Sequence, residues 1–422
     1  MRRLSALDAG FLALETDRAP LHIGALLLLD GPAPDGDLVR DELLRRVATV
    51  AACHERVRRA RGGLRRPTWA DDPRADPAAQ LHVTTVDPPG NRAALRRRVV
   101  ELMGVRLDTS RPLWEVWRVD GLADGGWALL LKAHHTLVDG VSGASLLAAL
   151  LSSQDDPTSG RSATIGRRPR PPLRERLSRL RHGVRTVAVP DLPPSVLNGQ
   201  LGDRRTWDWL TLDLVDLDEV ADRAGCTVND VYLTALSGGV RAVLSARGAL
   251  DPDARVRVIV PVSMRTGAGE ARTGNIDAAF FVELPVHVGS ARAMLVDVAA
   301  QTARAKVDGV PLATEALLRA GDLVPAPVLD RAARAYVRRG QARVNLAASD
   351  VRGPSTPLVL CGRSVREVVP CVPLALDVRT TSALMSYAGR ASISVTVDSA
   401  VTTDADALVS AIAATLAELR AG

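Results

Sequence analysis

The chain has 422 residues, of which 46% are hydrophobic and only 3% aromatic, enough for one large domain or two of ordinary size. A formal net charge of +6 is modest for this length and does not indicate nucleic-acid binding. The four cysteines lie far apart, so neither a disulfide framework nor a zinc ribbon is expected. The N-terminus lacks the apolar core of a signal peptide, and no run approaches the roughly 20 apolar residues of a membrane-spanning helix. We therefore expect a cytoplasmic protein that is soluble or peripheral to a membrane.

The first part of the chain mixes strand and helix patterns without the regular alternation of a doubly wound fold. A nearly continuous apolar run at 21–30 predicts a buried strand. The other elements predicted before residue 152 are a helix at 37–52, a strand at 81–86, a basic amphipathic helix at 92–102, strands at 114–119 and 127–132, and a helix at 141–151.

The composition changes between residues 152 and 205, where Pro, Gly, Ser and Arg are frequent, and this predicts a crossover linker. Within it, four apolar residues recur at helical spacing between arginines: Leu173, Leu177, Leu180 and Val184. Such a helix could lie on an anionic membrane surface. The simpler interpretation is a linker helix packed on the protein with a solvated basic face, because linker helices are common and the apolar stripe is thin.

A second series of elements follows the linker. The predicted elements are a strand at 207–214, a capped helix beginning near 219, a long helix at 226–246, strands at 256–262 and 278–286, a helix at 290–307, strands at 344–348, 357–360, 384–388 and 391–397, and a closing amphipathic helix at 404–420. We therefore predict an α/β protein with mixed sheets and three segments: an N-terminal half at 1–151, a basic Pro/Arg-rich linker at 152–205, and a C-terminal half at 206–422.

The stretch His134-His135-Thr136-Leu137-Val138-Asp139-Gly140 stands between a predicted strand and a predicted helix. Paired imidazoles suggest proton chemistry near neutral pH, and a neutral imidazole is suited to remove the proton of a hydroxyl that attacks an acyl carbonyl. A metal site competes with this interpretation, although zinc usually takes three protein ligands and no third candidate has a familiar spacing. A pair of ordinary, hydrogen-bonded core histidines is the third interpretation, and these residues alone leave all three open.

Other catalytic motifs are weaker. The stretch Gly140-Val141-Ser142-Gly143-Ala144 fails the G-x-S-x-G pattern, and Ala235-Leu236-Ser237-Gly238-Gly239 fits it only loosely and lies within a predicted helix. A serine hydrolase is therefore a minor alternative. The sequence contains neither G-x-G-x-x-G nor a P-loop, so dinucleotide and nucleoside-triphosphate chemistry are unsupported. We expect no metal and no cofactor.

The stretch 134–140 resembles the HHxxxDG signature of the CoA-dependent acyltransferase superfamily, which includes the condensation domains of peptide synthetases. Further stretches occur in the order seen in the bacterial wax ester synthase/diacylglycerol acyltransferase family. They are Leu4-Ser5-Ala6-Leu7-Asp8, Glu15, Pro20-Leu21-His22-Ile23-Gly24, Arg111-Pro112-Leu113-Trp114-Glu115, Leu197-Asn198-Gly199, Thr227-Val228-Asn229-Asp230, Pro261-Val262-Ser263-Met264-Arg265 and Gly353-Pro354. The resemblance covers nearly the whole chain.

This resemblance implies two chloramphenicol-acetyltransferase-like halves with a substrate tunnel between them. It also implies acyl-CoA as co-substrate and a fatty alcohol or diacylglycerol as acceptor, giving wax ester or triacylglycerol, at a membrane or lipid-droplet surface. His135 would be the general base, His134 its support, and Asp139, followed by Gly140, a structural residue that orients the loop. Arg265 of the second half is our candidate partner for Asp139. The remaining motif residues are expected to act through packing or helix capping: Pro112, Leu113, Trp114, Asn229 and Asp230.

Two departures from the family pattern lie in the second half. The family commonly has Ser-Asn-Val-Pro-Gly-Pro where this chain has Ser349-Asp350-Val351-Arg352-Gly353-Pro354, and Ser-Tyr-Asn-Gly where it has Ser386-Tyr387-Ala388-Gly389. Both leave the predicted base untouched and bear on the acceptor. The alternatives are therefore a condensation-type or specialised-metabolite acyltransferase, which could use a carrier-protein thioester, and an inactive lipid-binding protein.

Overall fold

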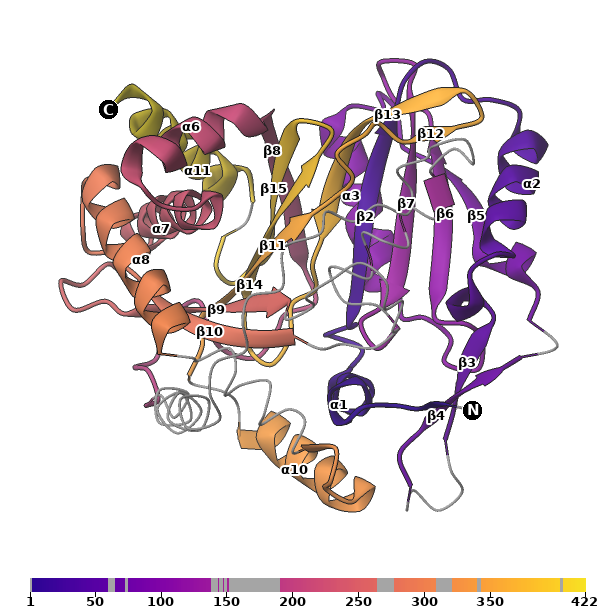
Figure 1. Ribbon diagram of the computed structural model, residues 1–422, viewed down its shortest axis with the longest axis horizontal. Coiled ribbons are helices and arrows are strands. Elements are labelled where there is room, and N and C mark those ends of the chain that lie inside the picture. The colour runs from indigo at the N-terminus through magenta and orange to yellow at the C-terminus, as the bar shows by residue number, and fades with distance from the viewer. Residues whose placement is uncertain are drawn as a thin grey trace.

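Two six-stranded sheets stand side by side in the computed structural model of the chain (Figure 1). The structure describes residues 2–59, 65–72, 75–137, 143, 147, 150–151, 190–263, 277–308, 321–339, 343–402 and 405–422. Helices cover the outer faces of the sheets, and each sheet contains both parallel and antiparallel pairs. The predicted α/β class with mixed sheets is confirmed.

The first sheet has the strand order β12-β13-β2-β7-β6-β5. Its strands are β2 (His22–Leu29), β5 (Leu81–Thr85), β6 (Trp114–Asp120), β7 (Trp127–His134), β12 (Val359–Leu360) and β13 (Arg363–Cys371). The central strand β2 pairs antiparallel with β7 over its full length and is buried on both faces, which explains its nearly continuous apolar sequence. Helices α2 (Gly36–Val47) and α3 (Arg92–Gly104) flank this sheet.

Strands β12 and β13 come from the second half of the sequence, yet they complete the first sheet. Strand β13 pairs with β2 on the side opposite β7, with Val369 beside Leu26. A division of the sequence at residue 206 therefore does not coincide with the division into sheets. The sequence pattern did not predict β13, because Pro370 argues against a central strand. Pro370 is tolerated because β12 covers only the other end of β13.

The second sheet has the order β10-β9-β11-β14-β15-β8. Its strands are β8 (Arg205–Asp213), β9 (Val256–Ser263), β10 (Asp277–Leu284), β11 (Leu346–Arg352), β14 (Thr380–Tyr387) and β15 (Arg390–Asp398). Its outer face carries the helices α6 (Leu214–Ala224), α7 (Val228–Ala246), α8 (Ala291–Val307) and α11 (Asp406–Ala421) (Figure 1). Helix α7 supplies much of the core between them, because most of its residues are buried.

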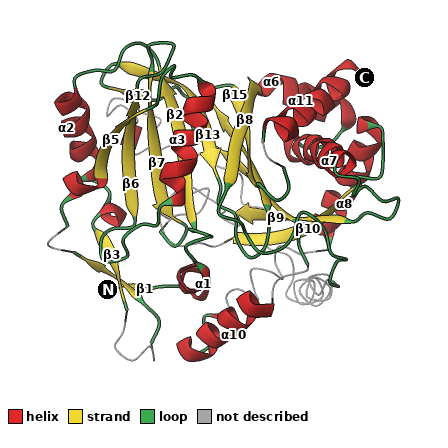
Figure 2. Cartoon of the chain, turned by 180° about the vertical axis from the view of Figure 1, so that it is seen from behind, coloured by secondary structure: helices red, strands yellow, loops and turns green. Residues whose placement is uncertain are grey.

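Smaller elements lie near the N-terminus. Strands β1 (Arg2–Arg3), β4 (Thr68–Asp71) and β3 (Glu55–Arg58) form a small separate sheet, and helix α1 (Ala6–Leu14) lies between it and helix α10 (Ala326–Arg339) (Figure 2). Short 3₁₀ turns occur at Ala51–Cys53 and Pro77–Gln80. The sequence pattern predicted neither α1 nor α10. The predicted linker helix lies outside the described residues, and so does most of the predicted helix at 141–151.

None of the helices in the described part of the chain combines the length and the apolar character that crossing a membrane requires.

Charged contacts tie the halves together. Asp208 of β8 accepts from Arg92 Nη2 of α3 at 2.9 Å and also pairs with Arg96. Below the sheets, Asp322 pairs with Arg66 at 2.7 Å and accepts the amide of Ala6 at 2.7 Å, which caps α1 from the second half. The sheets are therefore held together by side chains as well as by β13.

The Asp208 tie can be tested by removing its charge. We expect Asp208→Asn to lower the free energy of unfolding by about 2 kcal/mol, less than a fully buried pair would lose, because the Arg92 side chain is half exposed and can be hydrated. Urea-induced unfolding measures this loss as a lower midpoint concentration. Asp213→Asn removes an exposed pair with Arg390 and should cost less than about 1 kcal/mol. Equal losses in the two variants would show that Asp208 does not join the halves.

Candidate active site

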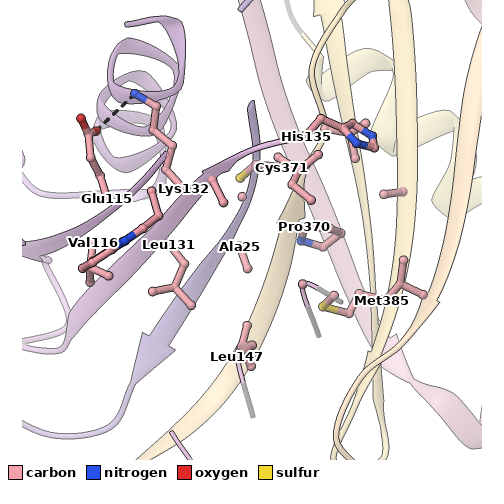
Figure 3. Close-up of a pocket in the computed structure, with 18 of the residues that line it drawn as sticks. Ala25, Glu115, Val116, Leu131, Lys132, His135, Leu147, Pro370, Cys371 and Met385 are labelled. Atoms are coloured by element: carbon pink, nitrogen blue, oxygen red, sulfur yellow. Dashed lines mark hydrogen bonds and ion pairs between the residues drawn. The ribbon is translucent and has the colours of Figure 1, made fainter. Parts of the chain in front are cut away.

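A cavity of about 900 Å³, its open mouth included, lies where the two sheets face each other (Figure 3). Its walls come from β2, β6, β7 and β13 of the first sheet and from β11 and β14 of the second. Most of the lining side chains are apolar, among them Ile23, Ala25, Leu131, Val351 and Met385. A deep apolar wall with few polar groups is suited to a hydrocarbon chain.

His135 lies on the wall of this cavity, directly after the last residue of β7. Its amide donates to the carbonyl of Leu21 at 2.8 Å. Its half-buried ring stacks on Phe11 of α1, with ring centroids 4.2 Å apart and an angle of 24° between the planes. The imidazole is therefore held against an aromatic face while it borders the cavity.

His134 occupies a different environment and is only 1% exposed. Its Nδ1 accepts the amide of Thr136 at 3.0 Å, so the proton of the neutral ring sits on Nε2. That Nε2 lies 3.5 Å from Glu15 Oε1. The amide of His134 donates to the carbonyl of Leu113 at 3.0 Å. The two adjacent histidines thus face apart, one toward the cavity and one into a polar cluster.

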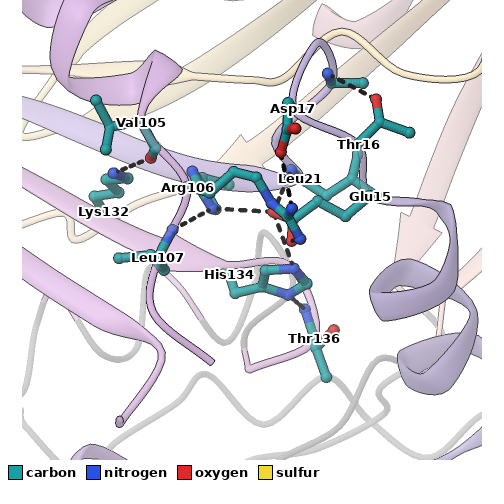
Figure 4. A network of polar contacts seen from close by, with 12 residues as sticks. Glu15, Thr16, Asp17, Leu21, Val105, Arg106, Leu107, Lys132, His134 and Thr136 are labelled. Atoms are coloured by element: carbon teal, nitrogen blue, oxygen red, sulfur yellow. Dashed lines mark hydrogen bonds and ion pairs between the residues drawn. The ribbon is translucent and has the colours of Figure 1, made fainter. Parts of the chain in front are cut away.

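The carboxylate of Glu15 is the centre of that polar cluster (Figure 4). Its Oε1 accepts the amide of Leu21 at 3.2 Å, and its Oε2 accepts from Arg106 Nη2 at 2.8 Å. Burial alone would raise the pKa of Glu15, but contacts with His134 and His22, and then with Arg106, hold that pKa well below its ordinary value. Glu15 is therefore an ionised carboxylate although its side chain is only 1% exposed.

His22 is the second imidazole of the cluster and faces His134 across the β2–β7 pair. Its Nε2 lies 3.2 Å from both Glu15 Oε1 and the amide nitrogen of Leu107, so only one of these contacts is a hydrogen bond in the neutral ring. Burial lowers the pKa of His22, against the opposing effect of Glu15. The ring is neutral near pH 7.

A buried lysine lies on the same side of the sheet. Lys132 Nζ donates to the carbonyls of Leu102 and Val105 at the C-terminal end of α3 and lies 3.3 Å from Glu115 Oε2. Burial lowers the pKa of Lys132, against the effect of Glu115. Figure 3 shows Lys132 and Glu115 turned toward each other and away from the apolar side chains of the cavity. The lysine therefore stabilises the end of α3.

The predicted motif at 112–114 lies beside the histidines. The carbonyl of Pro112 accepts from Gln80 Nε2 at 2.7 Å, and the carbonyl of Leu113 accepts the amide of His134. Trp114 lines the cavity and donates from Nε1 to the carbonyl of Cys53 at 2.9 Å. The motif thus supports the histidine loop through its backbone and the cavity wall through its indole.

Asn229 and Asp230 lie at the start of α7, and neither is among the described residues that line the cavity. Asp230 forms a capping box with Thr227, accepting its amide at 2.9 Å, while its other oxygen accepts from Thr302 of α8 at 2.7 Å. Asp230 therefore joins helices α7 and α8 of the second half and has a structural role.

Three predicted residues fall outside the described part of the chain: Asp139, Gly140 and Arg265. The proposed pairing of Asp139 with Arg265 therefore stays a prediction. Within the described residues, no three His, Cys, Asp or Glu side chains are arranged to hold a metal ion.

Two overlapping segments, residues 4–190 and 167–232, match the wax ester synthase/diacylglycerol acyltransferase catalytic domain, and residues 273–420 match the C-terminal domain of the same family. The chain belongs to the wax ester synthase/diacylglycerol acyltransferase family. This membership confirms the acyltransferase that the order of motifs implied. A Mycobacterium tuberculosis protein named "probable diacylglycerol O-acyltransferase" is 33% identical over 443 residues, covering 99% of this chain and 96% of that protein.

Solved structures confirm the predicted fold of this family member. The wax ester synthase/diacylglycerol acyltransferase of Marinobacter aquaeolei VT8 superposes with a TM-score of 0.72 at 23% identity, covering 99% of this chain and 98% of that one. A variant of the starter condensation domain of rhizomide synthetase, in complex with C8-CoA, gives a TM-score of 0.63 at 13% identity, covering 100% and 94%. The two-half architecture is therefore shared with both enzyme groups.

Glu15, His22, Arg106 and Phe11 are the site residues that the sequence did not assign. Glu15 and His22 were visible only as parts of family motifs, and Phe11 had no signal beyond being one of three phenylalanines. Arg106 follows a helix rich in arginine and was indistinguishable from the others. These residues meet only in the folded protein, where the segment before β2, the segment after α3 and the end of β7 lie side by side.

Asp350, the first departure from the family pattern, lies on β11 between the cavity-lining residues Ser349 and Val351. Although its side chain reaches solvent, the surrounding protein raises the pKa of this carboxyl to about 6, mainly by desolvation and against the opposing effect of Arg352. The folded protein therefore binds this proton more tightly than the unfolded chain, and ionisation of Asp350 destabilises the fold.

We accordingly expect Asp350→Asn to stabilise the protein only where Asp350 would be charged. The increase in the free energy of unfolding should be absent near pH 4, grow as the pH rises toward about 6, and stay constant above pH 6. Because the side chain is exposed, solvent screens the charge and the rise in unfolding temperature at pH 8 should be small, about 1–3 °C. Differential scanning calorimetry at pH 4 and pH 8 measures it. A gain of the same size at both values would contradict the pKa argument.

Proposed function

We propose that this acyltransferase moves a long-chain acyl group from acyl-CoA to the hydroxyl group of diacylglycerol or a fatty alcohol, giving triacylglycerol or wax ester. The observation that carries the proposal is the imidazole of His135 on the wall of an apolar cavity between the two sheets. The Mycobacterium tuberculosis relative supports diacylglycerol as first choice of acceptor, since its name specifies that substrate. The condensation domain in complex with C8-CoA supports an acyl-CoA donor, because its fold is similar.

In the proposed reaction His135 acts as general base. The imidazole takes the proton of the acceptor hydroxyl while the oxygen attacks the thioester carbonyl, forming a carbon–oxygen bond and a tetrahedral intermediate. When the intermediate collapses, the carbon–sulfur bond breaks and the imidazolium returns its proton to the CoA thiolate. The products are an ester and free CoA, and the enzyme regains neutral His135. The reaction requires no metal or cofactor, with acyl-CoA acting as co-substrate.

Both proposed products are apolar lipids, so the reaction would take place where such lipids gather. We propose that the protein works at a lipid surface, such as the cytoplasmic face of a membrane or a lipid droplet. The apolar lining of the cavity supports this, because an acyl chain can leave a lipid phase only for another apolar environment.

The role of His135 is tested by substitution. We expect His135→Ala to lower kcat by about 10²–10⁴-fold, the usual contribution of a general base, with little change in unfolding temperature. His287 is an exposed histidine of the second half, and His287→Ala should keep its activity. Released thiol, measured with palmitoyl-CoA and diacylglycerol, reports turnover. Activity retained in His135→Ala would exclude His135 as the base.

The acceptor and donor are tested by a screen with wild-type protein. We expect free CoA to appear from palmitoyl-CoA only when diacylglycerol or hexadecanol is present, with the matching ester detected by mass spectrometry. Thiol release from a palmitoyl carrier protein but not from palmitoyl-CoA would favour the condensation-type alternative. Binding of palmitoyl-CoA without turnover on any acceptor would favour a lipid-binding protein.

A further inference from the structure

The first sheet buries a carboxylate that the proposed acyl transfer does not use directly. Glu15 follows the last turn of α1, and its side chain is 1% exposed. Donors from three segments face it: the amide of Leu21, the guanidinium of Arg106 and the imidazole of His134. The ring of His22, whose Nε2 accepts the amide of Leu107, lies 3.2 Å away. A buried charge with this many partners is costly to assemble, since each group gives up its hydration.

The contacts of His134 connect Glu15 to the cavity. His134 accepts the Thr136 amide through Nδ1 at 3.0 Å, which closes a tight turn around His135, and the Leu137 amide donates to the His134 carbonyl at 2.8 Å. On the other side of the ring, Nε2 faces Glu15 Oε1 at 3.5 Å, beyond ordinary hydrogen-bond length but close enough for a strong electrostatic attraction between the N–H and the carboxylate. His135 therefore sits in a turn that is held by the side chain of the preceding residue.

We propose that Glu15 is a positioning residue for the acyl transfer, because its carboxylate holds His134 in the Nε2-protonated tautomer that lets the Thr136 amide close the turn presenting His135 to the cavity. This inference rests on the proposed role of His135 as base. Glu15 does not reach the cavity and touches no reacting atom. It acts through the ring of His134.

The opposite tautomer is incompatible with both neighbours of the ring. A proton on Nδ1 would face the Thr136 amide, so that two donors would oppose each other across 3.0 Å. The bare Nε2 would face a carboxylate, so that two acceptors would oppose each other. A negatively charged acceptor beside Nε2 therefore selects the tautomer. Arg106 holds that acceptor ionised and turned toward the imidazoles.

Glu15→Gln tests the proposal, because it removes the negative charge of the side chain but leaves its size and shape almost unchanged. Arg106 will bind the amide oxygen of the new side chain, which turns its NH₂ group toward His134 and favours a proton on Nδ1. We expect kcat to fall about 10- to 100-fold, as for a displaced catalytic group, with KM for palmitoyl-CoA changed less than about threefold. The matched control is Asp17→Asn, which removes an exposed carboxylate from the same Arg106 at 2.9 Å and should keep its activity.

The tautomer itself can be observed without turnover. Long-range ¹H–¹⁵N spectra of histidine-labelled protein, assigned by His134→Asn, should show Nε2–H in the wild type and in Asp17→Asn, and Nδ1–H in Glu15→Gln. Unchanged Nε2–H in Glu15→Gln would overturn the proposal, even if activity were lost. Because this readout does not depend on catalysis, it also separates a failure of this inference from a failure of His135 as base, which His135→Ala tests.

Two substitutions of His134 provide a second test, which does not require Glu15→Gln to fold. Asn places an acceptor near the position of Nδ1, whereas Gln places a donor near the position of Nε2. If the turn at Thr136 matters, His134→Asn should keep at least about tenfold more activity than His134→Gln. In the His134→Asn background, Glu15→Gln should change kcat less than about twofold, because the ring through which it acts is gone. Additive losses, or a more active His134→Gln, would overturn the proposal.

Discussion

The position of β2 between β7 and β13 is the constraint on which the rest of the structure depends. On one side β2 pairs with β7, with His22 opposite His134 at the end of the register, so that the histidine loop leaves the sheet beside the start of β2. On the other side it pairs with β13 from the second half. Backbone hydrogen bonds of a single strand thus fix the proposed base, His135, and one wall of the cavity relative to each other.

The two faces of this sheet have opposite chemistry, which follows from the two-residue period of a strand. Along β7, the side chains of Leu131 and Ala133 line the cavity, whereas the ammonium of Lys132, a residue that also borders the cavity, and the ring of His134 make their polar contacts with the end of α3 and with Glu15. The charged groups are therefore satisfied by backbone carbonyls and ion pairs on the far side of the strand, and the cavity wall stays mostly apolar. The proposed acyl chain would meet hydrocarbon, while polar contacts on the far side hold the loop that carries His135.

Sequence patterns predicted the elements whose character is decided locally. The run at 21–30 became β2 and the periodic segment at 226–246 became α7, because continuous burial and a capped amphipathic pattern leave little choice of structure. Strand β13 was missed because its partner lies more than 300 residues earlier in the chain and Pro370 masks the pattern. The position of His135 at a cavity followed from motif order, but the cluster at Glu15 did not. Four separate segments meet there, and local sequence patterns do not predict contacts between distant segments.

The two histidines suit the proposed division of labour, in which the general base has a neighbour of the same kind. A base must keep a ring nitrogen available to the substrate, so few of its own contacts can hold it in place. Two of the contacts that hold His135 are its backbone hydrogen bond with Leu21 and the face of Phe11, and neither of these two engages a ring nitrogen. The ring of His134 is fixed by a hydrogen bond from the Thr136 amide to Nδ1, and its Nε2 faces Glu15. In the proposed mechanism His134 thus supplies precision and His135 supplies reactivity, and the strand-like alternation of the chain keeps the two side chains on opposite sides of the backbone.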